Sequence, residues 1–262
     1  MAQGSDEAST EETARPSIPE ELLDDEHVRE EYGVNQFTAP SIKKIFEDLE
    51  VFGRLPYNEV ARPISKKIPR DRVVLSISMG RLIAEGFLVV QAEKIEPLED
   101  IGRALLKQAK VLGTGRRVTA HANSLLEKSV IGEWSSLRDE LAATQADVEA
   151  ELLMLRDVEV AHLLSLGGWL RAFEMATVVT ANDYSPEKAR GLARSEVVEY
   201  FLFSLSGLHP DLQETPPVVA LRDGLTQIQE RTDVPAGKAL SLEEVVVLRD
   251  VVNKTLNSLL GE

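Results

Sequence analysis

The chain has 262 residues, with 44 acidic and 29 basic side chains and a formal net charge of −15. It has no cysteine, which excludes disulfide frameworks, zinc–thiolate sites and iron–sulfur clusters. Hydrophobic residues make up 43%, which is too many for a wholly disordered chain and enough for a substantial core.

The charge is unevenly distributed along the chain. Residues 1–35 hold 11 acidic and 2 basic side chains, residues 43–117 hold 10 and 15, and residues 118–262 hold 23 and 12. A mainly acidic surface repels nucleic acid and anionic membranes, so we do not expect nucleic acid as a partner. The middle block is where an anionic ligand or an acidic protein partner would bind, unless it only neutralises the acidic leader.

In chain order, the first 35 residues are predicted to form an acidic and largely disordered leader, rich in Ser, Thr, Glu and Pro at its start. Residues 36–262 show apolar side chains at helical spacing. They predict a single all-α, bundle-like domain of about eight or nine helices. Helices are expected to begin at Pro40 and to cover 70–92, 95–112, 118–131, 137–166, 169–181, 186–206, 216–230 and 242–259.

The expected helix over 70–92 is apolar nearly all round, which is typical of a centrally buried helix. Arg81 and Glu85 interrupt its apolar run, so no membrane-spanning segment is predicted. The segment 2–7, which is small and acidic, resembles the start of a mature exported protein. Both an exported protein whose signal peptide has been removed and a cytoplasmic protein stay open.

Gly167 and Gly168 are expected to kink or break the long helix over 137–166. We favour a close helix crossing as the reason for the two glycines. The functional alternative is a pocket wall in which Arg171 faces a ligand anion. The heptad-like apolar seam of the long helix also permits self-association into a homo-oligomer.

Glu159 and His162 form the one candidate metal-binding pair, because residues three apart share a helix face. Bundles that bind two metal ions need a second Glu-x-x-His pair, and this chain has none. We therefore predict no metal ion and no other cofactor. The favoured interpretation is a polar interruption of the seam, with His162 hydrogen-bonded to a neighbour.

A basic helix end and a glycine-rich turn form the candidate anion site. Arg103 and Lys107 share one helical face with Lys110, and the turn at 113–117 ends in Arg116 and Arg117. Backbone N–H groups of such a turn and arginine side chains bind phosphate or carboxylate. The alternative is an ordinary helix end, with its favoured cations and a glycine stop.

Residues 43–93 resemble a winged helix of bacterial DNA-binding regulators. The recognition helix would be 72–85 and the wing strand 87–90. The resemblance rests on the segment 79–88, which looks like the end of a recognition helix followed by a wing. The expected recognition helix is rich in Val, Leu and Ile, which leaves few side chains to contact bases.

The favoured function is a non-enzymatic helical binding, sensory or scaffold protein. An anion pocket is expected near Arg103, Lys107, Arg116 and Arg117, or near Arg171. No catalytic residue is predicted, because the chain has no Gly-x-Ser-x-Gly elbow and its four histidines are scattered. The alternatives are the winged-helix regulator and a helical-bundle enzyme or metal protein.

Overall fold

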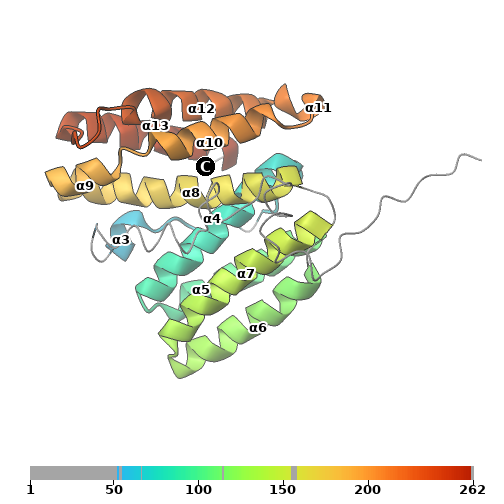
Figure 1. The fold of residues 1–262 in the computed structure, drawn as a ribbon. Coiled ribbons are helices and arrows are strands. Elements are labelled where there is room, and N and C mark those ends of the chain that lie inside the picture. The colour runs from blue at the N-terminus through green and yellow to red at the C-terminus, as the bar shows by residue number, and fades with distance from the viewer. Residues whose placement is uncertain (1–51, 53–54, 66, 114, 155–157, 261–262) are drawn as a thin grey trace, which may run out of the picture.

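The computed structural model describes residues 52, 55–65, 67–113, 115–154 and 158–260. Within these residues the protein is all-α and has no strand, which confirms the predicted fold class (Figure 1). The predicted leader 1–35 and the helix beginning at Pro40 lie outside the described residues. Eight helices of the described part have twelve or more residues: α4 (Arg72–Gln91), α5 (Ile95–Leu112), α6 (Gly115–Ile131), α7 (Trp134–Met154), α8 (Val158–Asn182), α10 (Ser195–Ser206), α12 (Pro216–Thr232) and α13 (Leu242–Leu260). Three short ones are α3 (Tyr57–Val60), α9 (Pro186–Gly191) and α11 (Pro210–Gln213).

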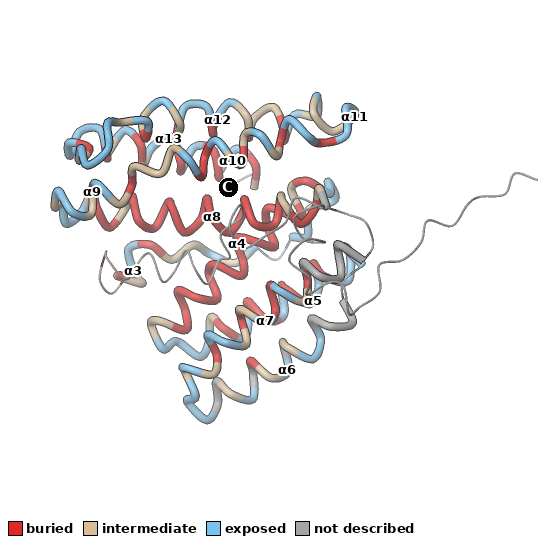
Figure 2. The backbone as a smooth tube through the Cα atoms, viewed as in Figure 1, coloured by how far each residue is buried: buried red, intermediate tan, exposed pale blue. Residues whose placement is uncertain are grey.

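Helices α4 and α8 cross at the centre of the molecule. Figure 2 shows both as mostly buried, with α5, α6 and α7 on one side and α10, α12 and α13 on the other. Seventeen of the 20 residues of α4 are buried, as the all-round apolar pattern predicted. By length and composition α4 could also cross a membrane, but 94% of its apolar window is buried inside the protein.

Glycines permit the close crossing of α4 and α8. A Cβ atom at Gly167 would lie 2.7 Å from the Cα of Ile77, and one at Gly80 would lie 2.8 Å from the backbone nitrogen of Gly168. The prediction of a helix break at Gly167 and Gly168 is therefore wrong, because α8 runs through both glycines. The long helix expected over 137–166 corresponds to α7, which is described to Met154, and to the first part of α8, which is described from Val158.

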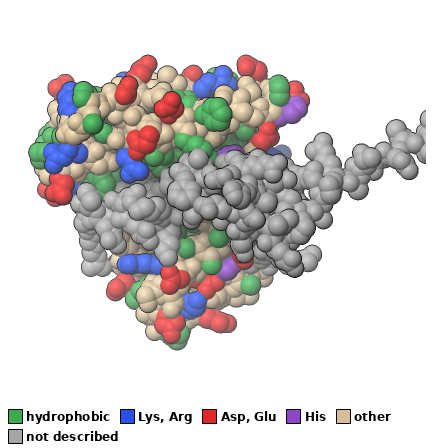
Figure 3. Space-filling model, viewed as in Figure 1, with side chains coloured by type: hydrophobic (Ala, Val, Ile, Leu, Met, Phe, Trp, Pro, Cys, Tyr) green, Lys and Arg blue, Asp and Glu red, His purple; other side chains and the backbone are tan. Residues whose placement is uncertain are grey.

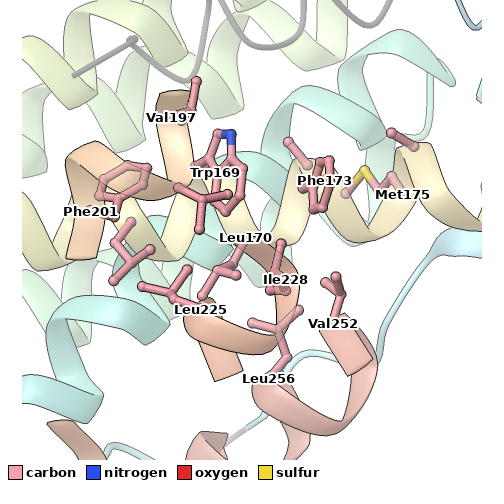
Figure 4. Packing of buried hydrophobic residues seen from close by; sticks show 14 of the residues in the cluster. Trp169, Leu170, Phe173, Met175, Val197, Phe201, Leu225, Ile228, Val252 and Leu256 are labelled. Carbon is pink, nitrogen blue, oxygen red and sulfur yellow. The ribbon is translucent and has the colours of Figure 1, made fainter. Parts of the chain in front are cut away.

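Two hydrophobic clusters flank the central pair. One joins α8 to α10, α12 and α13, and the other joins α4 to α5 and α7. Figure 4 shows the first cluster, in which the indole of Trp169 stacks on Phe173 with ring centroids 4.8 Å apart. Phe201 of α10 meets the same indole at 5.5 Å. Aromatic contacts of this kind add to the stabilisation from buried area.

Capping side chains begin the C-terminal helices where the sequence predicts them. Ser185 caps α9, and Ser241 and Glu244 form a reciprocal capping box at the start of α13. The prediction of a single helix over 186–206 is wrong, because this part of the chain forms two helices, α9 and α10. The division follows Gly191, where the ring of Phe52 packs so closely that a Cβ would lie 3.0 Å from its Cζ.

The winged-helix arrangement is absent from the described part of the chain. The expected wing strand 87–90 lies within the last five residues of α4, and the expected recognition helix 72–85 lies mostly in the core. A helix buried among other helices offers no face to a DNA groove. The expected first helix of that unit, 43–52, lies almost wholly outside the described residues.

Candidate functional site

The segment 61–71, which joins α3 to α4, is fixed at both ends. Arg62 donates hydrogen bonds of 2.5–3.0 Å to the carboxylate of Glu174 on α8, and one of 2.7 Å to Asn257 on α13. At the other end Asp71 caps α4 by accepting from the backbone N–H of Val74 at 3.0 Å. Both ends of the segment are therefore held against the helices.

A cavity of about 300 Å³ lies between the middle of this segment and α5. Its lining brings together three cations, Lys67 from the segment and Arg103 and Lys107 from α5. Apolar walls come from Ile64, Ile68 and Ala104, and the remaining lining residues are Ser65, Asp100 and Gln108. A concave, partly apolar surface with a few convergent polar groups is typical of a small-ligand site.

The three cations differ in their partners. Arg103 pairs with Glu99 at 2.7 Å and with Asp100 at 3.7 Å, and all three side chains are about half exposed or more. Such surface pairs are worth only about 0–1 kcal/mol, so a better anionic partner displaces them readily. Within the described residues, Lys67 and Lys107 have no carboxylate in ion-pair distance.

The structure brings only part of the predicted anion site together. Arg103 and Lys107 line the cavity, whereas Lys110, on the same helix, does not. Arg116 and Arg117 lie in the first turn of α6, and their side chains are outside what the structure describes. The helix before the turn does end at Gly113, which has the expected left-handed conformation with φ of 93°.

Arg171 lies in the core, 1% exposed. Its Nε donates to Glu85 of α4 and its Nη1 donates to Glu174, each at 2.7 Å. Its Nη2 donates to the backbone carbonyl of Val60. The guanidinium therefore binds protein carboxylates and joins α4, α8 and the end of α3. This geometry supports the packing explanation of the glycine pair over a pocket with Arg171 facing a ligand.

The candidate metal pair makes contacts within the protein. The hydroxyl of Tyr200 lies 2.8 Å from Nδ1 of His162, and Glu159 accepts from the backbone N–H of His209. Burial lowers the pKa of His162 to about 4, so this imidazole is neutral at pH 7. No group of three or more His, Cys, Asp or Glu side chains in the described part of the chain could hold a metal ion.

A second polar cluster, which the sequence did not indicate, joins α6 to α7. His121 contacts Glu140 through Nδ1 at 2.6 Å and Asp147 through Nε2 at 2.9 Å, and Lys128 also bonds Glu140. Burial alone would lower the pKa of His121, but the bonds to the two carboxylates outweigh it and raise that pKa. Burial of Glu140 is likewise outweighed by Lys128, Ser124 and His121, which lower its pKa to about 2.

No protein-family model, curated protein or solved structure matches the chain. The function must therefore be argued from the site itself. Sequence reasoning missed Lys67, which lies 36 residues before Arg103, because only the folded chain brings the segment against α5. It also did not single out Gln108, which lines the cavity, because an uncharged side chain within a helix does not indicate a binding site from the sequence.

Proposed function

We propose that this protein is a non-enzymatic binding protein for a small anionic ligand, held in the cavity between the segment 61–71 and α5. The observation that carries the proposal is the convergence of Lys67, Arg103 and Lys107 on one cavity in a chain whose net charge is −15. Figure 3 shows acidic, basic and hydrophobic side chains interspersed on one face of the molecule. In the cavity lining three cations stand against one carboxylate, Asp100.

The elements that carry the cations support the proposal. Arg103 and Lys107 come from one helix, and the ends of the segment that carries Lys67 are held by Arg62 and Asp71, so the entropy lost on binding is mainly that of the three side chains. Lysine and arginine N–H groups form charge-assisted hydrogen bonds with phosphate and carboxylate oxygens. The ligand would be released or captured by equilibrium binding, with no covalent step.

Calorimetric titration with inorganic phosphate at constant ionic strength tests the proposal. Lys107→Gln should weaken phosphate binding about tenfold, the effect of losing one charge-assisted hydrogen bond. Lys110→Gln is the matched control, because it removes the same charge from the same helix outside the cavity. Equal weakening by both variants would show a general charge effect, and no phosphate binding up to tens of millimolar would overturn the proposal.

A further inference from the structure

The cavity between the segment 61–71 and α5 has an apolar part beside its charged part. Ile64 and Ile68 line it from the segment, and Ala104 lines it from α5. Ile68 is 38% exposed, so part of this large apolar residue is accessible to a ligand in the cavity. Ala104 lies three residues before Lys107, which places both on the same face of α5. A ligand bound to the cations would therefore lie next to apolar surface.

The volume of the cavity favours a ligand larger than inorganic phosphate. The cavity measures about 300 Å³. This volume lies at the lower end of the roughly 300–1,000 Å³ found for pockets that bind organic ligands. Inorganic phosphate has no carbon atom, so it would leave the apolar lining in contact with water. A ligand with a hydrocarbon group would remove that apolar surface from water, which favours binding.

The charge of the lining favours a phosphate ester over a carboxylate. Lys67, Arg103 and Lys107 are positive and Asp100 is negative, so the described lining residues carry a formal charge of +2. A phosphate monoester carries about −1.5 to −2 at pH 7, whereas a carboxylate carries a single negative charge. Phosphate also offers three oxygens that accept charge-assisted hydrogen bonds, so it can bond more than one of these cations.

We propose that the ligand is a small phosphate monoester with an apolar ester group. The phosphate would bind the three cations of the cavity, and the hydrocarbon group would lie against Ile64, Ile68 and Ala104. This ligand class rests on the proposed function, because it uses the same three cations. It adds that binding depends on contacts with carbon atoms as well as on charge.

Titration calorimetry with methyl phosphate and butyl phosphate at constant ionic strength tests the inference. The two esters have the same charge and differ by three methylene groups, each of which strengthens binding about fourfold when fully buried. Because Ile68 and the cations are exposed, the cavity is open to solvent and we expect about half burial. Butyl phosphate should therefore bind the full-length protein about tenfold tighter than methyl phosphate. Pentanoate, which has the same four-carbon chain on a carboxylate, should bind about tenfold weaker than butyl phosphate, through loss of one charge-assisted hydrogen bond.

Ile68→Ser removes apolar surface from the cavity, and Ile95→Ser is the matched control. Ile95 is also an exposed isoleucine, at the start of α5, but it does not line the cavity. Ile68→Ser should reduce the preference for butyl phosphate from about tenfold to about threefold, because the other apolar lining remains. Its affinity for methyl phosphate should stay nearly unchanged, which also reports that the variant is folded. Ile95→Ser should keep the preference of the unaltered protein.

The outcomes distinguish failure of the ligand class from failure of the anion site. If both esters bind the unaltered protein equally tightly, and Lys107→Gln weakens both, the ligand class is wrong and the anion site stands. If Ile68→Ser and Ile95→Ser reduce the preference equally, the hydrocarbon group does not bind in the cavity and the ligand class is also wrong. If pentanoate binds as tightly as butyl phosphate, the assignment of a phosphate head group is wrong. If no phosphate compound binds, both proposals fail.

Discussion

Replacing Gly80 by alanine should strongly destabilise the protein, because the change acts at the crossing of α4 and α8. A Cβ at this position would lie 2.8 Å from the backbone nitrogen of Gly168 and closer still to the carbonyl oxygen of Leu164. Both atoms belong to the backbone of α8, so no side chain can rotate to make room. The contact must lengthen to the 3.4–4 Å of ordinary Cβ contacts, which moves the two helices apart.

The cost of this separation follows from the loss of close contacts. A buried leucine makes about 40–60 contacts worth ~0.1 kcal/mol each, and a gap of about 0.5–1 Å loses a quarter to a half of each. One leucine-sized side chain at the crossing would therefore lose about 1–3 kcal/mol. Because several side chains pack at this crossing, we expect a loss of about 3 kcal/mol or more, at or above the upper end for overpacked cores.

Urea unfolding followed by circular dichroism measures this loss, and Gly102→Ala is the matched control. Gly102 lies inside α5, where no described atom comes within 4 Å of an added Cβ. Alanine there should stabilise the protein by about 0.5–1 kcal/mol through helix propensity alone. If Gly80→Ala changes the free energy of unfolding by less than about 1 kcal/mol, the close crossing is not what these glycines provide.

Three further predictions concern the buried and half-buried charges. Arg171→Met should destabilise the protein by about 3–5 kcal/mol, because it leaves the carboxylates of Glu85 and Glu174 buried without this partner. Adding Glu85→Gln should recover part of that loss, and strict additivity of the two changes would contradict the pairing. Because the pKa of His121 is raised in the folded protein, the bonds of its protonated ring to Glu140 and Asp147 stabilise the fold. This stabilisation is fully present below pH 6.5 and is lost as the pH rises through the folded-state pKa. As the pH rises above 6.5, the free energy of unfolding should therefore fall more steeply in the unaltered protein than in His121→Gln, and equal slopes would refute a bonded, protonated His121. The lowered pKa of Glu140 acts in the opposite direction, because its contribution is present above pH 4.5 and is lost as the pH falls toward 2.

The sequence predicts the helices well because their local signals agree. The all-round apolar pattern of 70–92, the left-handed Gly113 and the capping box at Ser241 each act within a few residues. The break expected at Gly167 and Gly168 is wrong for a physical reason. Helix propensity counts the cost of glycine within one helix, whereas the compensating contact with Ile77 comes from another helix.

The candidate site is predicted only where its residues share a helix. Arg103 and Lys107 were predicted together, since residues four apart lie on the same face of α5. Lys67 comes from the segment 61–71, one end of which is held by the long-range bond from Arg62 to Glu174. No pattern within the sequence relates residues 112 positions apart.

Two pairs of cations in the described part of the chain differ in their partners, and the difference is consistent with the proposed site. Arg62 and Arg171 are buried or nearly so, and both bind Glu174, so their charges are compensated inside the protein. Lys67 and Lys107 are exposed at the rim of a cavity, where no described carboxylate pairs with them. Buried ions must be paired to offset the cost of desolvation, and that pairing fully accounts for Arg62 and Arg171.

Ion pairing within the described part of the protein does not account for Lys67 and Lys107 as it does for Arg62 and Arg171. Like charges gathered around one cavity repel one another, and the repulsion is removed when an anion binds between them. The two groups are also connected, because Glu174 holds both the core guanidinium of Arg171 and the Arg62 end of the cavity segment. The paired interior charges thus hold one end of the segment that carries Lys67, and under the proposed function Lys67 and Lys107 would pair with the ligand.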